Sequence, residues 1–249
     1  MKNKFLVLLL IFIALSYSLK AQICNSDPTV IPMYDIYTPM GTPVLTWLTE
    51  EDTPAARYER DSTYIAQYPF AEPIPIYNDG YYSTSRFNCH GYAWIRTEGG
   101  PDRWLSCDLR VDRLEQYKYM EDSSYIRVNS ETHPGKVSWS RMGDHSAVTT
   151  DEPGVVISKW GNGPLMKHDV HYSPCPIPMG LGLEYYVKNC SLVLENKAIT
   201  TDTPITSCGD ITVQNVTVTN GAKLTLDAAG EVNIISDFEV ELGSEFEIK

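Results

Sequence analysis

An internal repeat in the last forty residues constrains the fold of this chain more than any other feature. One copy runs from Val216 to Leu226 and the other from Phe238 to Ile248, with every matched position displaced by 22 residues. Apolar and polar residues alternate within each copy, as in strands separated by a turn. A period in this range predicts stacked β-solenoid coils. Two coils are fewer than the roughly three that usually support one another, so we expect the module to lean on the preceding domain or to cap itself.

Composition divides the rest of the chain. Aromatic and proline content falls towards the repeat, and the polar stretch 200–207 predicts a linker. We therefore expect a main domain over 22–199, the linker over 200–207 and a β-repeat module over 208–249. The module contains no histidine, and its one cysteine, Cys208, stands at its start. We expect it to serve attachment to a cell surface, or spacing, and not chemistry.

The N-terminus has the parts of a secretory signal peptide. Two lysines supply positive charge, an apolar run follows from Phe5 to Ala14, and Ala21 is a small residue suited to cleavage. The apolar run is too short to span a bilayer, and no later segment reaches the roughly 18 to 20 apolar residues that spanning requires. We therefore expect residues 1–21 to be removed and the mature protein to be secreted, with no integral membrane span.

The charge balance argues against a nucleic-acid partner. The full sequence holds 20 basic and 32 acidic residues, a formal net charge of −12 at pH 7. Loss of residues 1–21 removes three lysines and no acidic residue, which leaves 17 basic residues against 32 acidic ones. A surface of this charge repels phosphate backbones and anionic membranes.

In the main domain the sequence predicts helices before strands. Pro54 to Gln67 is one helix candidate, and a second opens at Cys89 and ends near the glycine pair 99–100. A third, amphipathic helix is expected over Asp108 to Met120. Two prolines in Glu72 to Tyr77 lack the N–H donor of a sheet ladder, so we expect an edge or wrapping segment there. Four strand candidates follow, at Tyr125–Val128, Lys136–Ser140, His145–Thr149 and Gly154–Lys159. Helices followed by an antiparallel sheet predict an α+β fold class.

Cys89 is the candidate nucleophile. It follows Asn88 at the start of a predicted helix, where unpaired backbone N–H groups and roughly half a positive charge favour the thiolate and lower the pKa of a cysteine. His145 opens a later strand and is the candidate base, because a strand that crosses the helix start can present its first side chain to the sulfur. His90 is a poor partner, since the next side chain on a helix points about 100° away.

The number of cysteines offers a competing interpretation. Six cysteines in an exported chain are ordinarily a disulfide set: Cys24, Cys89, Cys107, Cys175, Cys190 and Cys208. A free Cys89 leaves five others, of which at least one is unpaired, so the count by itself favours a bridge at Cys89. We favour the nucleophile, because a bridged cysteine has no need of the histidine strand. There is no C-x-x-C pair to indicate zinc or redox chemistry, and we expect no metal and no cofactor.

The order of these motifs resembles the NlpC-type and CHAP-type branches of the papain-like cysteine peptidases and amidases. Those families carry a cysteine behind a polar residue at a helix start, a Pro-Gly turn into an apolar strand, and a histidine strand. The counterparts here are Asn88-Cys89, Pro134 to Trp139 and His145 to Val148. The resemblance covers Tyr77 to His168 and implies a papain-like catalytic domain with N-terminal helices packed on an antiparallel sheet. It also implies hydrolysis of amide or peptide bonds, with peptidoglycan stem peptides as the substrate class.

The third catalytic residue is left open by the sequence. Ser158 stands where those families carry a histidine, an asparagine or an acid that orients the base, and serine is a weak orienter. His168 is an alternative if its segment folds back, and Asp144 is another. The residues expected to border the substrate cleft are Asn88, Trp160 and Gly161.

Together these features predict an exported cysteine hydrolase that works through an acyl-enzyme on Cys89, with His145 as base and then as acid. Two other interpretations fit the same residues. One is a catalytically inactive papain-like surface or adhesion module, which the weak orienter Ser158 motivates. The other is an acyltransferase that uses the same side chains.

Overall fold

The described part of the chain is mostly β. In the computed structural model, strands account for 45% of the residues and helices for 15%. The structure describes residues 31–249 apart from 106, 109–112, 140–144 and 175–181. The expected signal peptide, residues 1–21, lies outside the described residues. Within the described part of the chain, none of the helices has the length and apolar character that a membrane span requires.

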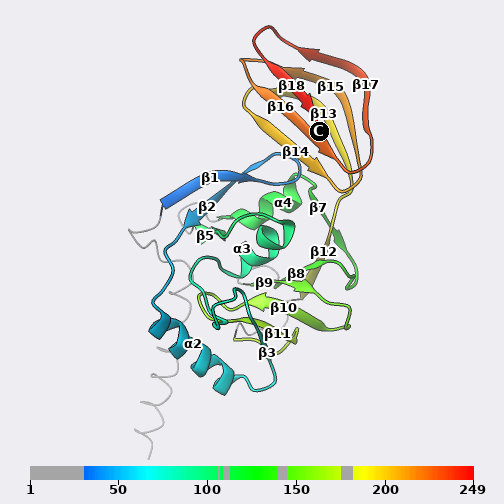
Figure 1. Ribbon diagram of the computed structural model, residues 1–249. Coiled ribbons are helices and arrows are strands. Elements are labelled where there is room, and N and C mark those ends of the chain that lie inside the picture. Colours follow the sequence, from blue (N-terminus) through cyan, green and yellow to red (C-terminus); the bar gives the residue numbers. More distant parts are fainter. Residues whose placement is uncertain (1–30, 106, 109–112, 140–144, 175–181) are drawn as a thin grey trace, which may run out of the picture.

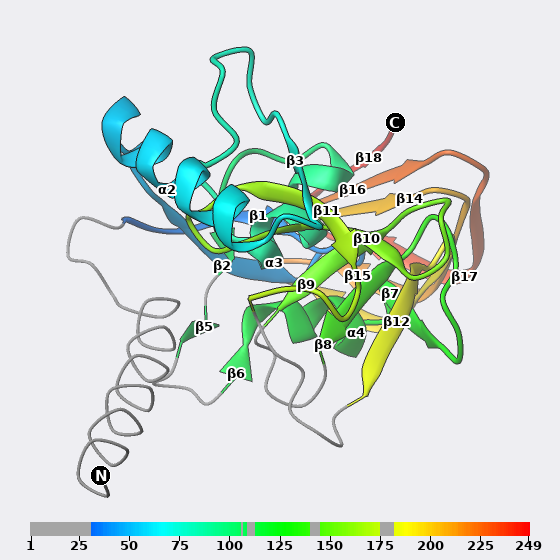
Figure 2. The same cartoon turned by 90° about the horizontal axis from the view of Figure 1, so that it is seen from below.

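The expected α+β papain-like fold is wrong. The α-helices among the described residues are short, and the chain forms several sheets instead of one sheet covered by N-terminal helices. Helix α2 (Pro54–Gln67) agrees with the prediction, and α3 (Cys89–Trp94) begins at the predicted residue. Figures 1 and 2 show α2 at the periphery of the fold, on the side away from the C-terminal strands.

The third predicted helix, 108–120, is replaced by shorter elements. The described part of this segment contains β5 (Cys107–Asp108), β6 (Arg113–Leu114), a 3₁₀ turn at Glu115–Tyr117 and the start of α4 (Lys118–Glu121). Glu115 and Gln116 are buried, and the carboxylate of Glu115 accepts the backbone N–H of Leu45 at 2.7 Å. Such tertiary contacts override the helical spacing of the apolar residues, because propensity is only a weak determinant of local structure.

A seven-stranded antiparallel sheet forms the centre of the main body, in the order β3-β11-β10-β9-β8-β12-β7. The four predicted strands are confirmed as its members β7, β8, β9 and β10, and the proline-containing segment 72–77 supplies the edge strand, as expected. The bounds are β3 Glu72–Ile74, β7 Tyr125–Val128, β8 Lys136–Trp139, β9 Ser146–Thr149, β10 Val155–Lys159, β11 Leu165–Asp169 and β12 Leu183–Lys188.

Both faces of the central sheet are covered. Helix α3 packs against β9 and β10 on one face, where Trp94 and aromatic rings of α4, β7 and β12 form one core cluster. Val137, Trp139 and Ala147 belong to a second cluster on the opposite face. In Figure 1, α3 and α4 lie between the central sheet and the C-terminal strands. The start of α3 is therefore enclosed within the molecule.

A hairpin at the beginning of the described chain connects the main body to the C-terminal module. Strands β1 (Ile31–Tyr37) and β2 (Pro43–Leu48) pair with each other, and β2 also pairs with β4 (Trp104–Leu105). In the turn between them, Met40 is buried in the apolar core of the module, and the carbonyl of Pro39 accepts the N–H of Thr206 at 2.9 Å. The module thus packs against the main body, as expected for a small stack of coils.

The C-terminal module consists of two parallel sheets whose strands stack coil upon coil (Figure 1). Val216 pairs with Phe238 and Leu224 with Phe246, which confirms the displacement of 22 residues. A third coil precedes the repeat. One sheet is β13 (Ser191–Ile199), β15 (Asp210–Val218) and β17 (Val232–Val240), and the other is β14 (Thr203–Ser207), β16 (Lys223–Ala228) and β18 (Glu245–Ile248).

The added coil shifts the boundary of the module. The segment 200–207, expected as a linker, contains β14, and the stacked strands begin at Ser191 instead of residue 208. The first coil is displaced from the second by 19 residues in one sheet, where Lys197 pairs with Val216, and by 21 in the other, where Thr203 pairs with Leu224. Because these spacings differ from 22, the sequence comparison at a fixed period does not find this coil.

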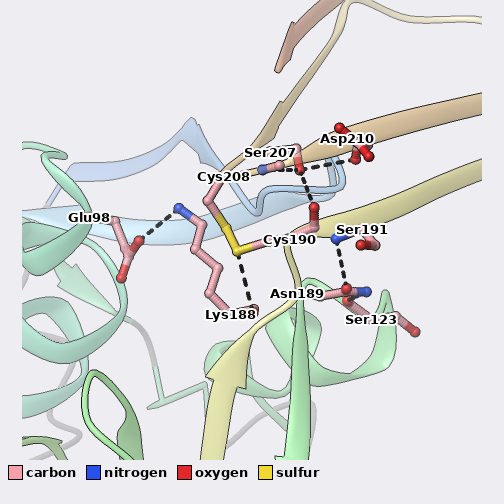
Figure 3. The surroundings of a disulfide bond; sticks show 10 residues. Glu98, Ser123, Lys188, Asn189, Cys190, Ser191, Ser207, Cys208 and Asp210 are labelled. Atoms are coloured by element: carbon pink, nitrogen blue, oxygen red, sulfur yellow. Dashed lines mark hydrogen bonds and ion pairs between the residues drawn. A yellow bond between two sulfur atoms is a disulfide. The ribbon is translucent and has the colours of Figure 1, made fainter. Parts of the chain in front are cut away.

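A disulfide joins Cys190 to Cys208 at the end of the module near the main body (Figure 3). It links the residue before β13 to the residue after β14, so it closes the first coil. Close by, Lys188 forms an ion pair with Glu98 at 2.9 Å, and the hydroxyl of Ser207 donates to the carbonyl of Cys190 at 3.2 Å. These contacts hold the junction between β12 and the module.

We predict that the core of the module contributes strongly to the stability of the whole chain. Leu224 is fully buried, so Leu224→Ala should lower the free energy of unfolding by about 2–5 kcal/mol. The matched control is Leu242→Ala in the same module, where the side chain is fully exposed and the expected change is within about 0.5 kcal/mol. Guanidinium unfolding followed by far-UV circular dichroism measures both, and equal effects of the two substitutions would contradict the stacked-coil core.

Candidate functional site

The start of α3 is fixed by Asn88 and Gly91. The side-chain carbonyl of Asn88 accepts the N–H of Gly91 at 2.8 Å, while its amide donates to the carbonyl of Leu105 at 3.1 Å. A Cβ atom on Gly91 would lie 1.9 Å from the carbonyl oxygen of Arg103, so only glycine fits there. Asn88 is buried and acts as the helix cap, which differs from the cleft position expected for it.

The sulfur of Cys89 lies in a polar but closed environment. Burial raises the pKa of the Cys89 thiol to about 11, although hydrogen bonds with the backbone at Ser146 and His90 and the charge of Lys159 act in the opposite direction. The sequence predicts a lowered pKa from the helix start alone. In the structure the cost of removing a thiolate from water outweighs those favourable contacts. Cys89 is free, so the disulfide interpretation of this residue is wrong.

His145 immediately precedes β9, and the start of this strand contacts the Cys89 sulfur through its backbone. Ser146, the next residue, hydrogen-bonds to Cys89 through its backbone, but the imidazole of His145 packs against Trp139, with ring centroids 4.7 Å apart. Successive side chains on a strand point to opposite faces of the sheet. Ser146 faces α3, as its contacts show, so His145 projects from the opposite face, beside Trp139. The contacts given for the described residues thus join Cys89 to the backbone at Ser146 and the imidazole of His145 to Trp139, and the pairing of sulfur with imidazole stays a prediction.

The imidazole of His145 is buried with one ring nitrogen unpaired among the described residues. Its Nε2 has no hydrogen-bond partner among the described residues. Burial lowers its pKa well below the ordinary value of 6.5, and the nearby rings of His168 and His90 lower it further. His145 is therefore neutral at neutral pH.

Ser146 connects Trp94 to His90. The indole Nε1–H of Trp94 donates to the Ser146 hydroxyl at 3.0 Å, and that hydroxyl lies 2.8 Å from Nδ1 of His90. These two contacts fix the His90 ring of α3 against the start of β9.

Ser158 makes the same kind of contact on the opposite face of the sheet. It accepts from the indole of Trp160 at 2.9 Å and donates to Nε2 of His168 at 2.7 Å, and Nδ1–H of His168 donates to the carbonyl of Asp169 at 2.8 Å. Burial lowers the pKa of His168. Ser158 thus orients His168, and neither of these two expected orienters hydrogen-bonds to His145. Asp144, the third option, lies outside the described residues.

Lys159 is the functional candidate that sequence reasoning missed. Its side chain is completely buried at the end of β10, and the ammonium donates to the carbonyls of Thr84 at 2.8 Å and Gly161 at 2.6 Å. Burial lowers the pKa of Lys159 to about 7, against the opposing charges of Cys89 and Glu51. A lysine that ends a strand is usually exposed, so the sequence carries no signal for this burial.

The two remaining cleft candidates also have structural contacts. Trp160 is buried against Tyr64 and Tyr68, and Gly161 adopts a left-handed backbone with φ of +59° while its carbonyl binds Lys159. A cavity of about 230 Å³ lies elsewhere, between the β1–β2 turn, α3 and β14. In the described ranges, no group of three or more His, Cys, Asp or Glu side chains is arranged to hold a metal ion.

Comparison with known proteins identifies no relative: no protein-family model matches the sequence, and neither a curated protein nor a solved structure is significantly similar to the chain.

We predict that Ser158→Ala destabilises the protein by about 1–3 kcal/mol. The substitution removes the acceptor of the buried indole N–H of Trp160 at 2.9 Å and the donor to Nε2 of His168 at 2.7 Å. It leaves the indole only a longer contact of 3.4 Å to that ring nitrogen, and poorly satisfied buried polar groups cost this much. Ser191→Ala is the control, because the exposed Ser191 side chain should change stability by less than about 0.5 kcal/mol. Urea unfolding of both variants measures the difference. A neutral effect of Ser158→Ala would show that the Trp160–Ser158–His168 contacts are not formed.

Stability should fall in mild acid because His145 is buried in its neutral form. Its folded-state pKa is lowered, so the stability from this group is present above the unfolded pKa near 6.5 and is lost as the pH falls below that value. The slope is at most about 1.4 kcal/mol per pH unit for each such histidine. His145→Phe, which keeps a ring beside Trp139, should flatten the decline between pH 7.5 and 5. The matched control, His171→Phe at an exposed position, should leave the wild-type slope unchanged.

Proposed function

We propose that this chain is an exported thiol hydrolase that cleaves amide or peptide bonds through an acyl-enzyme on Cys89. The observation that carries the proposal is a free cysteine with buried ionisable side chains on both faces of the strands beside it. His90 and Lys159 are buried on the α3 side, with the charge of Lys159 acting on Cys89, and His145 and His168 are buried on the opposite face of the sheet. Buried ionisable groups are costly, and they gather at functional sites more often than in structural cores.

The contacts of Cys89 favour a thiolate once the sulfur is exposed. Among the influences on its pKa, burial alone raises the value, whereas the backbone at Ser146 and His90 and the charge of Lys159 lower it. Water or a polar substrate at the sulfur would remove the cost of burial and leave the favourable contacts in place. The arrangement described above is therefore that of a closed site, in which the thiol is protonated.

In the proposed reaction the Cys89 thiolate attacks the carbonyl carbon of the scissile amide. The C–N bond breaks, the leaving amine takes a proton, and water then hydrolyses the thioester and restores the thiol. His145 serves as base and then as acid, because its Nε2 has no partner, whereas Nδ1 of His90 and both ring nitrogens of His168 already have hydrogen-bond partners. The proposal requires the substrate to displace the imidazole from Trp139.

The substrate class proposed is a peptide, with peptidoglycan stem peptides first. This choice rests on the resemblance of the Cys89 and His145 segments to NlpC-type and CHAP-type enzymes. The signal-peptide pattern supports export, and the stacked coils offer a surface for attachment that is separate from the chemistry. No nucleic acid is included among the partners, in keeping with the acidic composition.

A second candidate function is a non-enzymatic surface module. The specific observation in its favour is the burial of Cys89, since an inert structural cysteine is typically buried with a raised pKa. The last coils also expose large apolar side chains, among them Ile235 and Leu242, which would suit adhesion.

We predict that the mature protein releases amines from murein stem peptides or from denatured polypeptide. Cys89→Ser should reduce that release by roughly 10³-fold or more, the scale on which loss of a nucleophile acts. His145→Ala should reduce it as well, whereas the matched control His171→Ala, at an exposed site, should not. Chromatography of the released peptides measures turnover, and mass spectrometry of the quenched protein identifies the acyl adduct on Cys89.

The outcomes separate the candidate functions. Transfer of the acyl group to an added amine in place of water would identify an acyltransferase that uses the same residues. Absence of both turnover and a Cys89 adduct with either substrate contradicts the hydrolase and leaves the surface module.

A further inference from the structure

Lys159 is a buried cation without a carboxylate beside it. Its two hydrogen-bond acceptors, the carbonyls of Thr84 and Gly161, carry no net charge. Among the described residues, no ion pair within 4 Å joins its Nζ to an Asp or Glu side chain, in contrast to the buried Lys136, which contacts Glu98 at 2.6 Å. A buried ammonium is expensive unless an opposite charge compensates it. The fold therefore places Lys159 where a counterion is needed.

The charged groups that face Lys159 come from three elements. The Cys89 sulfur at the start of α3 is the first of them, and Glu51, which precedes α2, is the second. On α2, Asp61 contributes further attraction, and Arg60 opposes it. Asp61 is held by the backbone N–H of Tyr82 at 2.9 Å, and Glu51 accepts the N–H of Ser85 at 3.0 Å. Both carboxylates thus have other donors, and Cys89 is the remaining acidic group that acts on Lys159.

The position of the ammonium is fixed from two sides. Thr84 and Phe87 belong to the segment that leads into α3, and Gly161 follows β10. Nζ lies 5.5 Å from the centre of the Phe87 ring, a distance at which a ring face attracts a cation. The left-handed backbone of Gly161, with φ of +59°, accompanies the turn that directs its carbonyl to Nζ. The contacts of the described residues account for two of the three N–H donors of the ammonium.

We propose that the Lys159 ammonium is the counterion of the Cys89 thiolate, so that the ion pair at this nucleophile is formed with lysine and not with histidine. When the thiol ionises, it gives its proton to a base, which is water in the free protein and His145 in the proposed reaction, and the ammonium keeps its three protons, so one negative charge forms beside one positive charge. This role rests on the proposed function for its catalytic meaning. It separates two tasks: Lys159 stabilises the thiolate, and His145, once protonated by the thiol, passes that proton to the leaving amine.

The test is the pH dependence of Cys89 alkylation in the full mature chain. Iodoacetamide labelling is followed by peptide mass mapping, so that only the Cys89 peptide is counted. Lys159→Met removes the charge and should raise the midpoint of the labelling profile by one pH unit or more. Labelling at a pH below both midpoints then slows about tenfold or more. Lys159→Arg keeps the charge and should stay closer to the wild-type midpoint than Lys159→Met does.

Lys136→Met is the matched control, because it removes another buried lysine whose partner is Glu98 and should leave the midpoint unchanged. If circular dichroism shows that Lys159→Met does not fold, Lys159→Gln takes its place, since it retains a donor for the carbonyls of Thr84 and Gly161. The same midpoint in wild type and in the folded charge-removing variant overturns the inference, and so does an equal shift in Lys136→Met.

The labelling profile is independent of turnover, so the two proposals can fail separately. If the midpoint shifts in Lys159→Met but the protein hydrolyses neither substrate, the hydrolase proposal is contradicted and the ion-pair proposal is supported. If turnover depends on Cys89 but the midpoint does not shift, the ion-pair proposal is contradicted and the hydrolase proposal is supported.

Discussion

The close approach of the first turn of α3 to the main chain around it determines the rest of the candidate site. Gly91 lets the helix contact the carbonyl of Arg103, and Asn88 fastens the same turn to Leu105. With the turn held there, Cys89 meets the backbone of β9, and His90 and Trp94 converge on Ser146. A larger residue at position 91 would separate the helix from its neighbours, and the polar contacts of the sulfur would be lost with it.

Burial determines the chemistry at this contact. The N-terminal end of a helix favours a thiolate, but the enclosed position of Cys89 reverses that preference, and the same enclosure keeps His145 neutral and brings Lys159 towards neutrality. Burial thus shifts the pKa values of all three groups in the direction that favours the uncharged form. Access of water to the sulfur would remove the cost of burial and so allow the thiolate to form.

The sequence predicts local features of this protein better than their arrangement. Hydrophobic alternation identifies the strands β7 to β10, and the start of α3 follows from Asn88 and Cys89, because these signals are local. The papain-like architecture fails, since the pattern of short segments does not reveal how many sheets the chain forms. Whether His145 lies on the α3 face or on the Trp139 face depends on the register of β9 against β8, where Ser138 pairs with Ser146. A shift of one residue would reverse it, and no sequence motif encodes that register. The buried ammonium of Lys159 is likewise a product of packing.

The disulfide between Cys190 and Cys208 has a mechanical consequence for an anchored protein. Tension between the main body and the C-terminal end enters the module at Cys190 and passes through the sulfur atoms directly to Cys208. The intervening coil, β13 and β14, is therefore bypassed by the covalent path while the bridge is intact. Force instead reaches the second coil first, where β15 is flanked on both sides by parallel neighbours.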